Sequence, residues 1–98
     1  MIADEKVKEV CDLYYDKIAG FGPAVKMPGM EPADKSEAMR HVRWMTIETK
    51  KFIDEGRREK AMRWIGFMQG WLTAYCIYNL ADVMNHVRPS ESEFDPSK

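Results

Sequence analysis

Cysteine and histidine are scarce in this chain of 98 residues, with two of each, and this limits the chemistry that the chain can carry. Neither cysteine has a histidine at an informative spacing. The acid–histidine pairs Glu37 with His41 and Asp82 with His86 are typical of ordinary helical ion pairs. The six glycines match neither the phosphate-binding loop nor the dinucleotide-binding pattern. We therefore expect no metal and no cofactor, and we interpret the protein as non-enzymatic.

A membrane-spanning run and a strong net charge are also lacking. The most apolar stretch, residues 64–78, is too short to cross a bilayer comfortably and contains Gln69. The formal net charge of −1 gives no general attraction to nucleic acid or to an anionic membrane. The chain is charged from Asp4 onward and shows no secretion signal, so we expect a cytoplasmic protein that does not bind membranes.

Helical periodicity is the main signal that the chain does contain. Hydrophobic residues make up 45% and charged residues 32%, which is the composition of a folded domain, and we expect an all-α fold. Apolar residues recur at helical spacing over residues 3–20, which predicts a first amphipathic helix. Residues 22–32 hold three prolines and two glycines, which predicts a loop that contacts the body through Val25, Met27 and Met30.

Two longer helices should follow and form an antiparallel hairpin. Asp34 with Glu37 resembles a capping box, and Gly56 is a plausible left-handed stop for the second helix. The third helix then runs over residues 58–78, or from one residue earlier; one long helix with Gly56 inside it is the alternative. The predicted buried stripe of the second helix comprises Ala38, Val42, Met45, Thr49 and Phe52, widened by Trp44 and Ile47. Its basic residues, expected mostly on the solvated side, are Lys35, Arg40, Arg43, Lys50 and Lys51.

The end of the chain predicts one more short element. Asn79 is expected to cap a fourth helix over residues 80–87. We expect a single helical domain over residues 1–88 and a disordered tail over residues 89–98. Cys11 and Cys76 lie in apolar helical patterns, and we interpret both as buried free thiols.

Residues 64–78 are apolar almost all the way round a helix, with only Gln69 and Thr73 carrying polar side chains. A helix that is apolar on every side must be covered on every side. A chain of this size has few other elements to cover it, so we expect a homo-oligomer built around this helix. The residues assigned to helix packing or to the oligomer interface are Trp64, Gly66, Phe67, Gln69, Gly70, Trp71, Ala74 and Tyr75.

Gly66, Gly70 and Ala74 lie four residues apart and form a groove of small residues along one face. Glycine costs roughly 1 kcal/mol relative to alanine inside a helix, so two glycines indicate that something uses the space. Packing against the second helix, packing against a second copy of the chain and a ligand cleft are three open interpretations. The bulky stripe between Trp64 and Tyr75 is interpreted as core, and Gln69 should bond a backbone group or its copy across an interface.

Four basic residues cluster at the start of the third helix: Arg57, Arg58, Lys60 and Arg63. An anion is favoured at a helix N-terminus, so the cluster suggests a phosphate or carboxylate site. If it holds a nucleotide phosphate, Trp64 or Tyr75 would stack on the base. The alternative is a solvated basic patch that acidic neighbours partly balance.

The C-terminal half resembles a group of small uncharacterised proteins encoded by tailed bacteriophages. The resemblance rests on residues 55–57, 60–61, 63–70 (RWIGFMQG) and 85–89 (NHVRP). It implies a phage origin, a helical hairpin followed by a short helix, and no known activity. Our leading hypothesis is a phage accessory protein in the host cytoplasm that binds and blocks or sequesters a host component, such as a defence protein. The alternatives are a small-molecule or nucleotide-binding protein and a nucleic-acid-associated protein.

Overall fold

Four α-helices and one short 3-10 helix make up the computed structural model, which describes residues 2–29 and 34–88. The all-helical fold class is confirmed, since the described residues contain no strand. Met30 and the expected disordered tail lie outside the described residues. The elements are α1 (Asp4–Lys17), η1 (Ala19–Phe21), α2 (Lys35–Asp54), α3 (Arg58–Ala74) and α4 (Leu80–His86).

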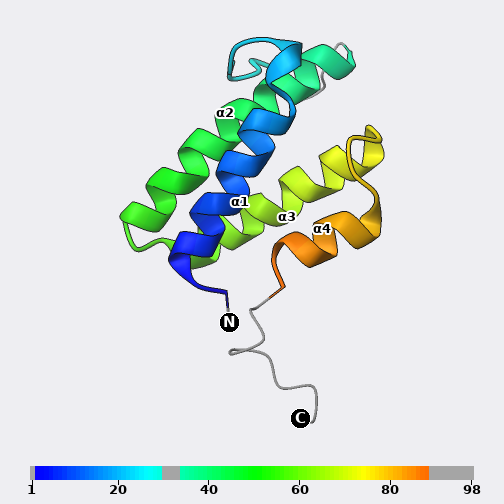
Figure 1. Cartoon of the computed structure of the whole chain (residues 1–98). Helices are drawn as coiled ribbons and strands as arrows, with labels where there is room; N and C mark the ends of the chain where they lie inside the picture. Colours follow the sequence, from blue (N-terminus) through cyan, green and yellow to red (C-terminus); the bar gives the residue numbers. More distant parts are fainter. Residues whose placement is uncertain (1, 30–33, 89–98) are drawn as a thin grey trace.

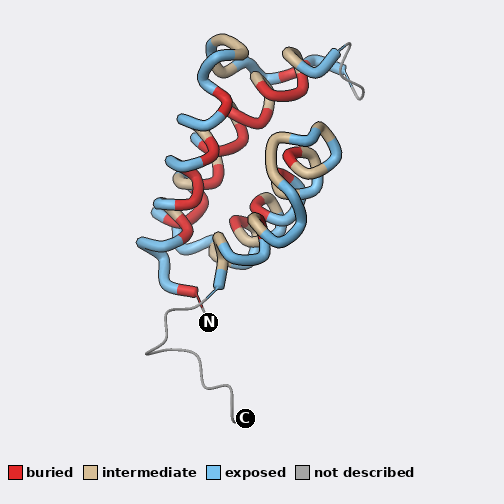
Figure 2. The backbone as a smooth tube through the Cα atoms, turned by 45° about the vertical axis from the view of Figure 1, so that its right-hand side comes forward, coloured by how far each residue is buried: buried red, intermediate tan, exposed pale blue. Residues whose placement is uncertain are grey.

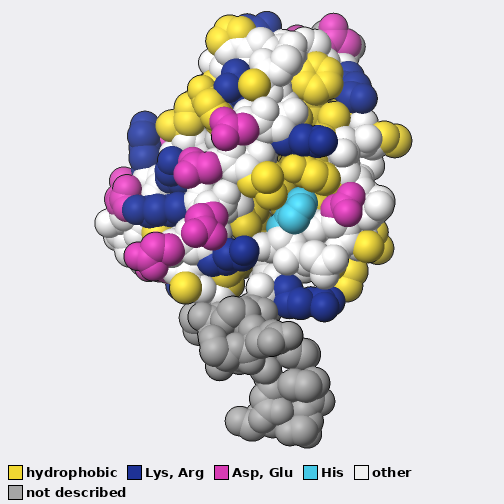
Figure 3. Space-filling model, in the orientation of Figure 1, with side chains coloured by type: hydrophobic (Ala, Val, Ile, Leu, Met, Phe, Trp, Pro, Cys, Tyr) yellow, Lys and Arg dark blue, Asp and Glu magenta, His cyan; other side chains and the backbone are white. Residues whose placement is uncertain are grey.

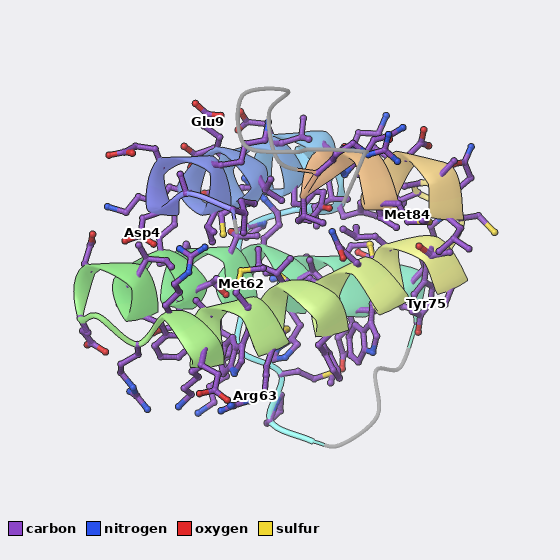
Figure 4. All side chains as sticks on the ribbon, turned by 90° about the horizontal axis from the view of Figure 1, so that it is seen from below. Asp4, Glu9, Met62, Arg63, Tyr75 and Met84 are labelled. Carbon is purple, nitrogen blue, oxygen red and sulfur yellow. The ribbon has the colours of Figure 1, made fainter. Side chains whose placement is uncertain are left out.

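The helices form two layers. Figure 4 shows α1 and α4 on one side and α2 and α3 on the other. The buried face of α1 presents Val7, Val10, Cys11 and Tyr14 to the hairpin, as its periodicity predicts. Figure 2 shows the buried stretches of α1 and α2 facing each other, whereas much of α4 and the turn before it is exposed or intermediate. Helix α1 therefore covers the hairpin well, whereas α4 covers little of it.

The α2–α3 hairpin is closed by a glycine in the left-handed region. Gly56 has φ of 77°, and the Arg57 N–H donates to the Phe52 carbonyl at 2.8 Å. The Gly56 N–H donates to Ile53, and these two bonds together satisfy the last carbonyls of α2. The alternative of one long helix is therefore wrong, because the chain reverses at Gly56.

The same backbone arrangement ends α3, four residues before the predicted end at Tyr78. Cys76 has φ of 63°, and the Ile77 N–H donates to the Leu72 carbonyl at 2.8 Å. A cysteine in the left-handed region gives no sequence signal of a helix stop, because glycine usually fills this place. Cys76 is also exposed, which corrects the expectation of a buried thiol.

Most of the predicted stripe of α2 is confirmed, because Ala38, Val42, Met45, Thr49 and Phe52 are all buried. The Asp34 carboxylate caps this helix by accepting from the Glu37 N–H at 2.8 Å. Two expectations are wrong: Ile47 is exposed, and Arg43 is buried rather than solvated.

Arg43 joins α2 to the segment where α1 ends. Its Nε donates to the Tyr15 carbonyl at 3.1 Å and its guanidinium lies 3.8 Å from the centre of the Tyr15 ring. Its Nη1 donates to the Gly22 carbonyl at 2.6 Å. A buried cation is tolerated here because carbonyl groups at a helix C-terminus carry partial negative charge.

The loop that leads to α2 is anchored along that helix. The Val25 N–H donates to the Arg40 carbonyl at 3.2 Å. The Met27 N–H donates to His41 Nδ1 at 3.0 Å, and the Met27 side chain is buried as predicted. The Val25 side chain is exposed, so the prediction that it packs against the body is wrong, and Val25 contacts α2 through its backbone.

Helix α4 begins with the predicted cap. The Asp82 N–H donates to Asn79 Oδ1 at 2.8 Å, and the Asn79 N–H donates to Asp82 Oδ2 at 3.1 Å. The helix turns back along α3, and Val83 is its one buried residue (Figure 1). A helix with so small a buried face covers little of its neighbour.

The strained end of α3 generates a stability prediction. We expect Cys76→Gly to raise the free energy of unfolding by about 1 kcal/mol, because a side chain in the left-handed region costs roughly that much. Urea unfolding followed by circular dichroism measures the change. Gly56→Ala is the matched opposite and should lower the free energy of unfolding by about 1 kcal/mol. A destabilised Cys76→Gly variant would contradict the assignment of strain.

Candidate functional site

Helix α3 is buried along one stripe and open along the rest. Its buried residues are Ala61, Ile65, Met68 and Leu72, which face α1 and α2. Phe67 is 48% exposed, and Gly66, Gly70 and Ala74 are exposed as well. The described chain by itself therefore leaves part of this helix uncovered, and its covering by a second copy of the chain stays a prediction.

The small-residue face of α3 and the apolar face of α4 enclose an open groove of about 830 Å³. An ideal Cβ built on Gly66 or on Gly70 meets no heavy atom within 4 Å. Packing of this face against the second helix is therefore excluded among the interpretations of the sequence. The groove is lined by Gly66, Gln69, Gly70, Thr73, Ala74, Leu80, Val83, Met84, Val87 and Arg88.

Helix α4, which forms the other wall of the groove, has large apolar side chains that are exposed to solvent. Leu80 is 64% exposed and Met84 is 56% exposed, although both line the groove. Figure 4 labels Met84 on the side of α4 that faces α3. Figure 3 shows further hydrophobic side chains gathered around a histidine between α1 and α4, beside the groove rather than in it. Exposed contiguous apolar surface of this kind marks interaction sites.

The structure divides the predicted interface residues between two faces. Gly66, Gln69, Gly70 and Ala74 line the groove. The aromatic members lie on a neighbouring face, where Trp64 packs against Trp44 with ring centroids 5.8 Å apart. Phe67 packs against Trp71 at 4.9 Å, and Trp71 against Tyr75 at 6.3 Å. Trp64, Trp71 and Tyr75 are half-buried, so the expectation that this stripe is core holds only for Met68 and Leu72. Their role in an oligomer stays a prediction.

Gln69 holds α4 against α3 and α1. Its Nε2 donates to the Val83 carbonyl at 3.1 Å and to the Tyr14 hydroxyl at 3.1 Å. The prediction that Gln69 bonds a backbone group is confirmed. The Tyr14 hydroxyl lies 2.8 Å from His86 Nδ1, and burial raises the pKa of Tyr14 to about 12. Sequence reasoning missed this triad, because Tyr14 reads as an ordinary core residue and His86 as an isolated one.

The structure spreads the four predicted anion ligands over separate contacts. Arg57 lies 3.5 Å from Glu55, Arg63 lies 3.9 Å from Glu59, and Arg58 pairs with Asp4 of α1. The Lys60 ammonium lies 4.6 Å from the centre of the Phe52 ring. Arg63 points away from α1 and α4 (Figure 4). This arrangement fits a basic patch balanced by acids, in which Arg58 is half-buried, and the four side chains form no convergent anion site.

Metal-binding and thiol chemistry have little support in the geometry. Residues 2–29 and 34–88 contain no group of three His, Cys, Asp or Glu side chains placed to hold a metal. Cys11 is buried as predicted, and burial raises the pKa of its thiol to about 12. Across the same residues, every helix is too short or too polar to span a membrane.

Comparison with known proteins gives no match for this chain, either among family models, among curated proteins or among solved structures. The resemblance of the C-terminal half to phage-encoded proteins therefore stays a prediction, and the geometry of the groove and its polar triad is what a functional proposal can rest on.

The open floor of the groove generates a second stability prediction. Gly70→Ala should raise the free energy of unfolding by about 1 kcal/mol, because alanine is the better helix former and its methyl group meets no neighbour. Chemical denaturation of the purified protein measures the change. A loss of stability of similar size would mean that the Gly70 face is packed in solution.

Proposed function

We propose that this protein acts by binding another protein, and that the α3–α4 groove receives an apolar helical segment of that partner. One observation carries the proposal: Gly66 and Gly70 leave the α3 backbone open to close approach, beside the exposed side chains of Leu80 and Met84. Proteins commonly recognise an amphipathic helix by laying its apolar face into such a groove.

The chemistry of the lining favours a helix over a small molecule. Pockets for small ligands hold a few placed polar groups that fix the orientation of the ligand. Here the Gln69 amide already donates two hydrogen bonds within the chain, and the remaining polar lining is Thr73 and Arg88. Recognition therefore rests on apolar shape, which side chains at helical spacing supply.

The charge of the lining narrows the partner further. Arg88 is the one charged residue among those that line the groove. Helix α4 runs back along α3 (Figure 1), so its C-terminal end, which Arg88 follows, lies toward the N-terminal part of α3. A partner helix with a carboxylate at that end would complement it. If the phage resemblance holds, this partner is a host component that the protein blocks or sequesters, and a defence protein is the expected kind.

The alternative functions lack a specific observation in their favour. A nucleotide site needs Arg57, Arg58 and Arg63 to converge, and each of them lies beside a carboxylate instead. Lys50 and Lys51, which would extend a nucleic-acid-binding patch, likewise lie beside Asp12 and Glu48.

A pair of matched variants tests the groove. Gly70→Leu fills the floor where no neighbour stands, whereas Ala81→Leu adds the same side chain to α4 at a residue that does not line the groove. We expect a partner captured from host cells, then purified, to bind the wild type and Ala81→Leu equally by calorimetry. Binding to Gly70→Leu should fall by at least about tenfold, because a filled pocket excludes the anchor side chain.

Two outcomes would contradict this proposal. Equal binding by all three proteins would place the partner elsewhere on the surface. Light scattering could instead show a dimer that is lost in Gly70→Leu and kept in Ala81→Leu. The groove would then be the interface with a second copy of this chain, as the apolar character of α3 suggests.

A further inference from the structure

A directed chain of hydrogen bonds crosses from α3 to α1 and on to α4. Gln69 Nε2 lies 3.1 Å from the Val83 carbonyl oxygen and 3.1 Å from the Tyr14 hydroxyl. The Tyr14 hydroxyl then lies 2.8 Å from His86 Nδ1. These bonds join Tyr14 to Gln69, which is 55 positions away in the sequence, and to His86, which is 72 positions away.

The direction of this chain is fixed by its first acceptor. A backbone carbonyl can only accept, so the Gln69 amide must turn its NH₂ group toward Val83. The second hydrogen of that nitrogen is donated to the Tyr14 oxygen. The single hydroxyl hydrogen of Tyr14 is then free to be donated to His86 Nδ1. This direction requires a neutral His86 whose ring hydrogen is on Nε2.

We propose that His86 is an acid-released latch that holds α4 as the movable wall of the groove. When Nδ1 takes up a proton from solvent, it loses its lone pair and can no longer accept from Tyr14, which keeps its own hydroxyl hydrogen. The Tyr14 oxygen can accept from the protonated ring only if its own hydrogen turns away, and a charged ring then occupies a partly buried position, so the link between α4 and α1 weakens. The release of α4 can be tested without any partner. Its effect on partner binding rests on the function proposed for the groove.

Apart from His86, helix α4 is held by the Gln69 hydrogen bond to the Val83 carbonyl and by a small buried face. It has seven residues, of which only Val83 is buried, and both Leu80 and Met84 are exposed. The His86 ring contacts the rings of Tyr78 and Tyr14, with centroids 4.7 Å and 5.3 Å away. The contact of His86 with α1 adds to the buried face at Val83 and to the Gln69 hydrogen bond, and its loss loosens a short element.

The groups around His86 keep the latch closed at neutral pH. Burial is the largest influence and lowers the pKa of His86; Asp82, one turn earlier on α4, raises it, and Lys6 on α1 lowers it. Tyr14 and Tyr78, which face the ring, stay neutral because burial raises the pKa of each. The net lowering means that the contribution of His86 to stability is complete above its unfolded pKa of about 6.5, and is lost as the pH falls through and below that value.

Nuclear magnetic resonance of the full chain tests the latch without any partner. Long-range ¹H–¹⁵N correlation of the imidazole at about pH 8 should show the hydrogen of His86 on Nε2. Amide exchange is then compared at about pH 8 and about pH 5 as protection factors, which remove the intrinsic pH dependence of exchange. We expect protection over residues 80–86 to fall by about tenfold relative to α1, the loss of roughly one hydrogen bond.

Two matched variants separate His86 from the other titrating groups. His86→Gln offers an amide oxygen that accepts from Tyr14 and does not titrate, so α4 should stay protected at both pH values. His41→Gln replaces the other histidine of the chain, which lies on α2 and accepts from the Met27 N–H of the loop, and should keep the wild-type response of α4.

Two results would overturn the latch: a hydrogen on Nδ1 of His86 at about pH 8, or the same loss of α4 protection in His86→Gln as in the wild type. Neither result would touch the groove proposal, which the Gly70→Leu comparison tests by itself. Conversely, a groove without a partner would leave the response of α4 to pH intact.

Discussion

The apolar circumference of α3 exceeds what the rest of the described chain covers, and this imbalance organises the molecule. α1 and α2 bury the stripe that contains Ile65, Met68 and Leu72. The aromatic face beside it is half-covered by rings from α2, such as Trp44. The remaining arc, which carries Gly66 and Gly70, is left to α4, whose single buried residue is too little to cover it. The groove lies along this uncovered arc of α3.

The early end of α3 makes this arrangement possible. Because Cys76 adopts the left-handed conformation, the chain reverses and Asn79 can start a helix that returns along α3. Had α3 continued to Tyr78, the return of the chain would begin one turn farther on, and Val83 would no longer lie beside Gln69. The turn that strains the backbone at Cys76 therefore also sets the position of α4, which is one wall of the groove.

Polar groups hold together what apolar packing leaves loose. The buried Arg43 fastens the end of α1 to α2 through carbonyl oxygens. At α4 the corresponding contact joins the Tyr14 hydroxyl to His86 Nδ1. The firmly packed helices are therefore held by a buried guanidinium, and the exposed helix by the contact that we propose as a latch.

Local patterns determined the elements of this fold. The caps at Asp34, Gly56 and Asn79 and the buried faces of α1 and α2 follow from residues within a turn or two of one another, and such short-range chemistry is written in the sequence.

Only the tertiary structure decided which faces of α3 remain open, because an all-apolar helix has no polar face to mark its exposed side. It also decided the burial of Arg43 and the meeting of Tyr14, Gln69 and His86. These depend on partners that lie far apart in the chain, and neither periodicity nor composition records which distant residues will be brought together.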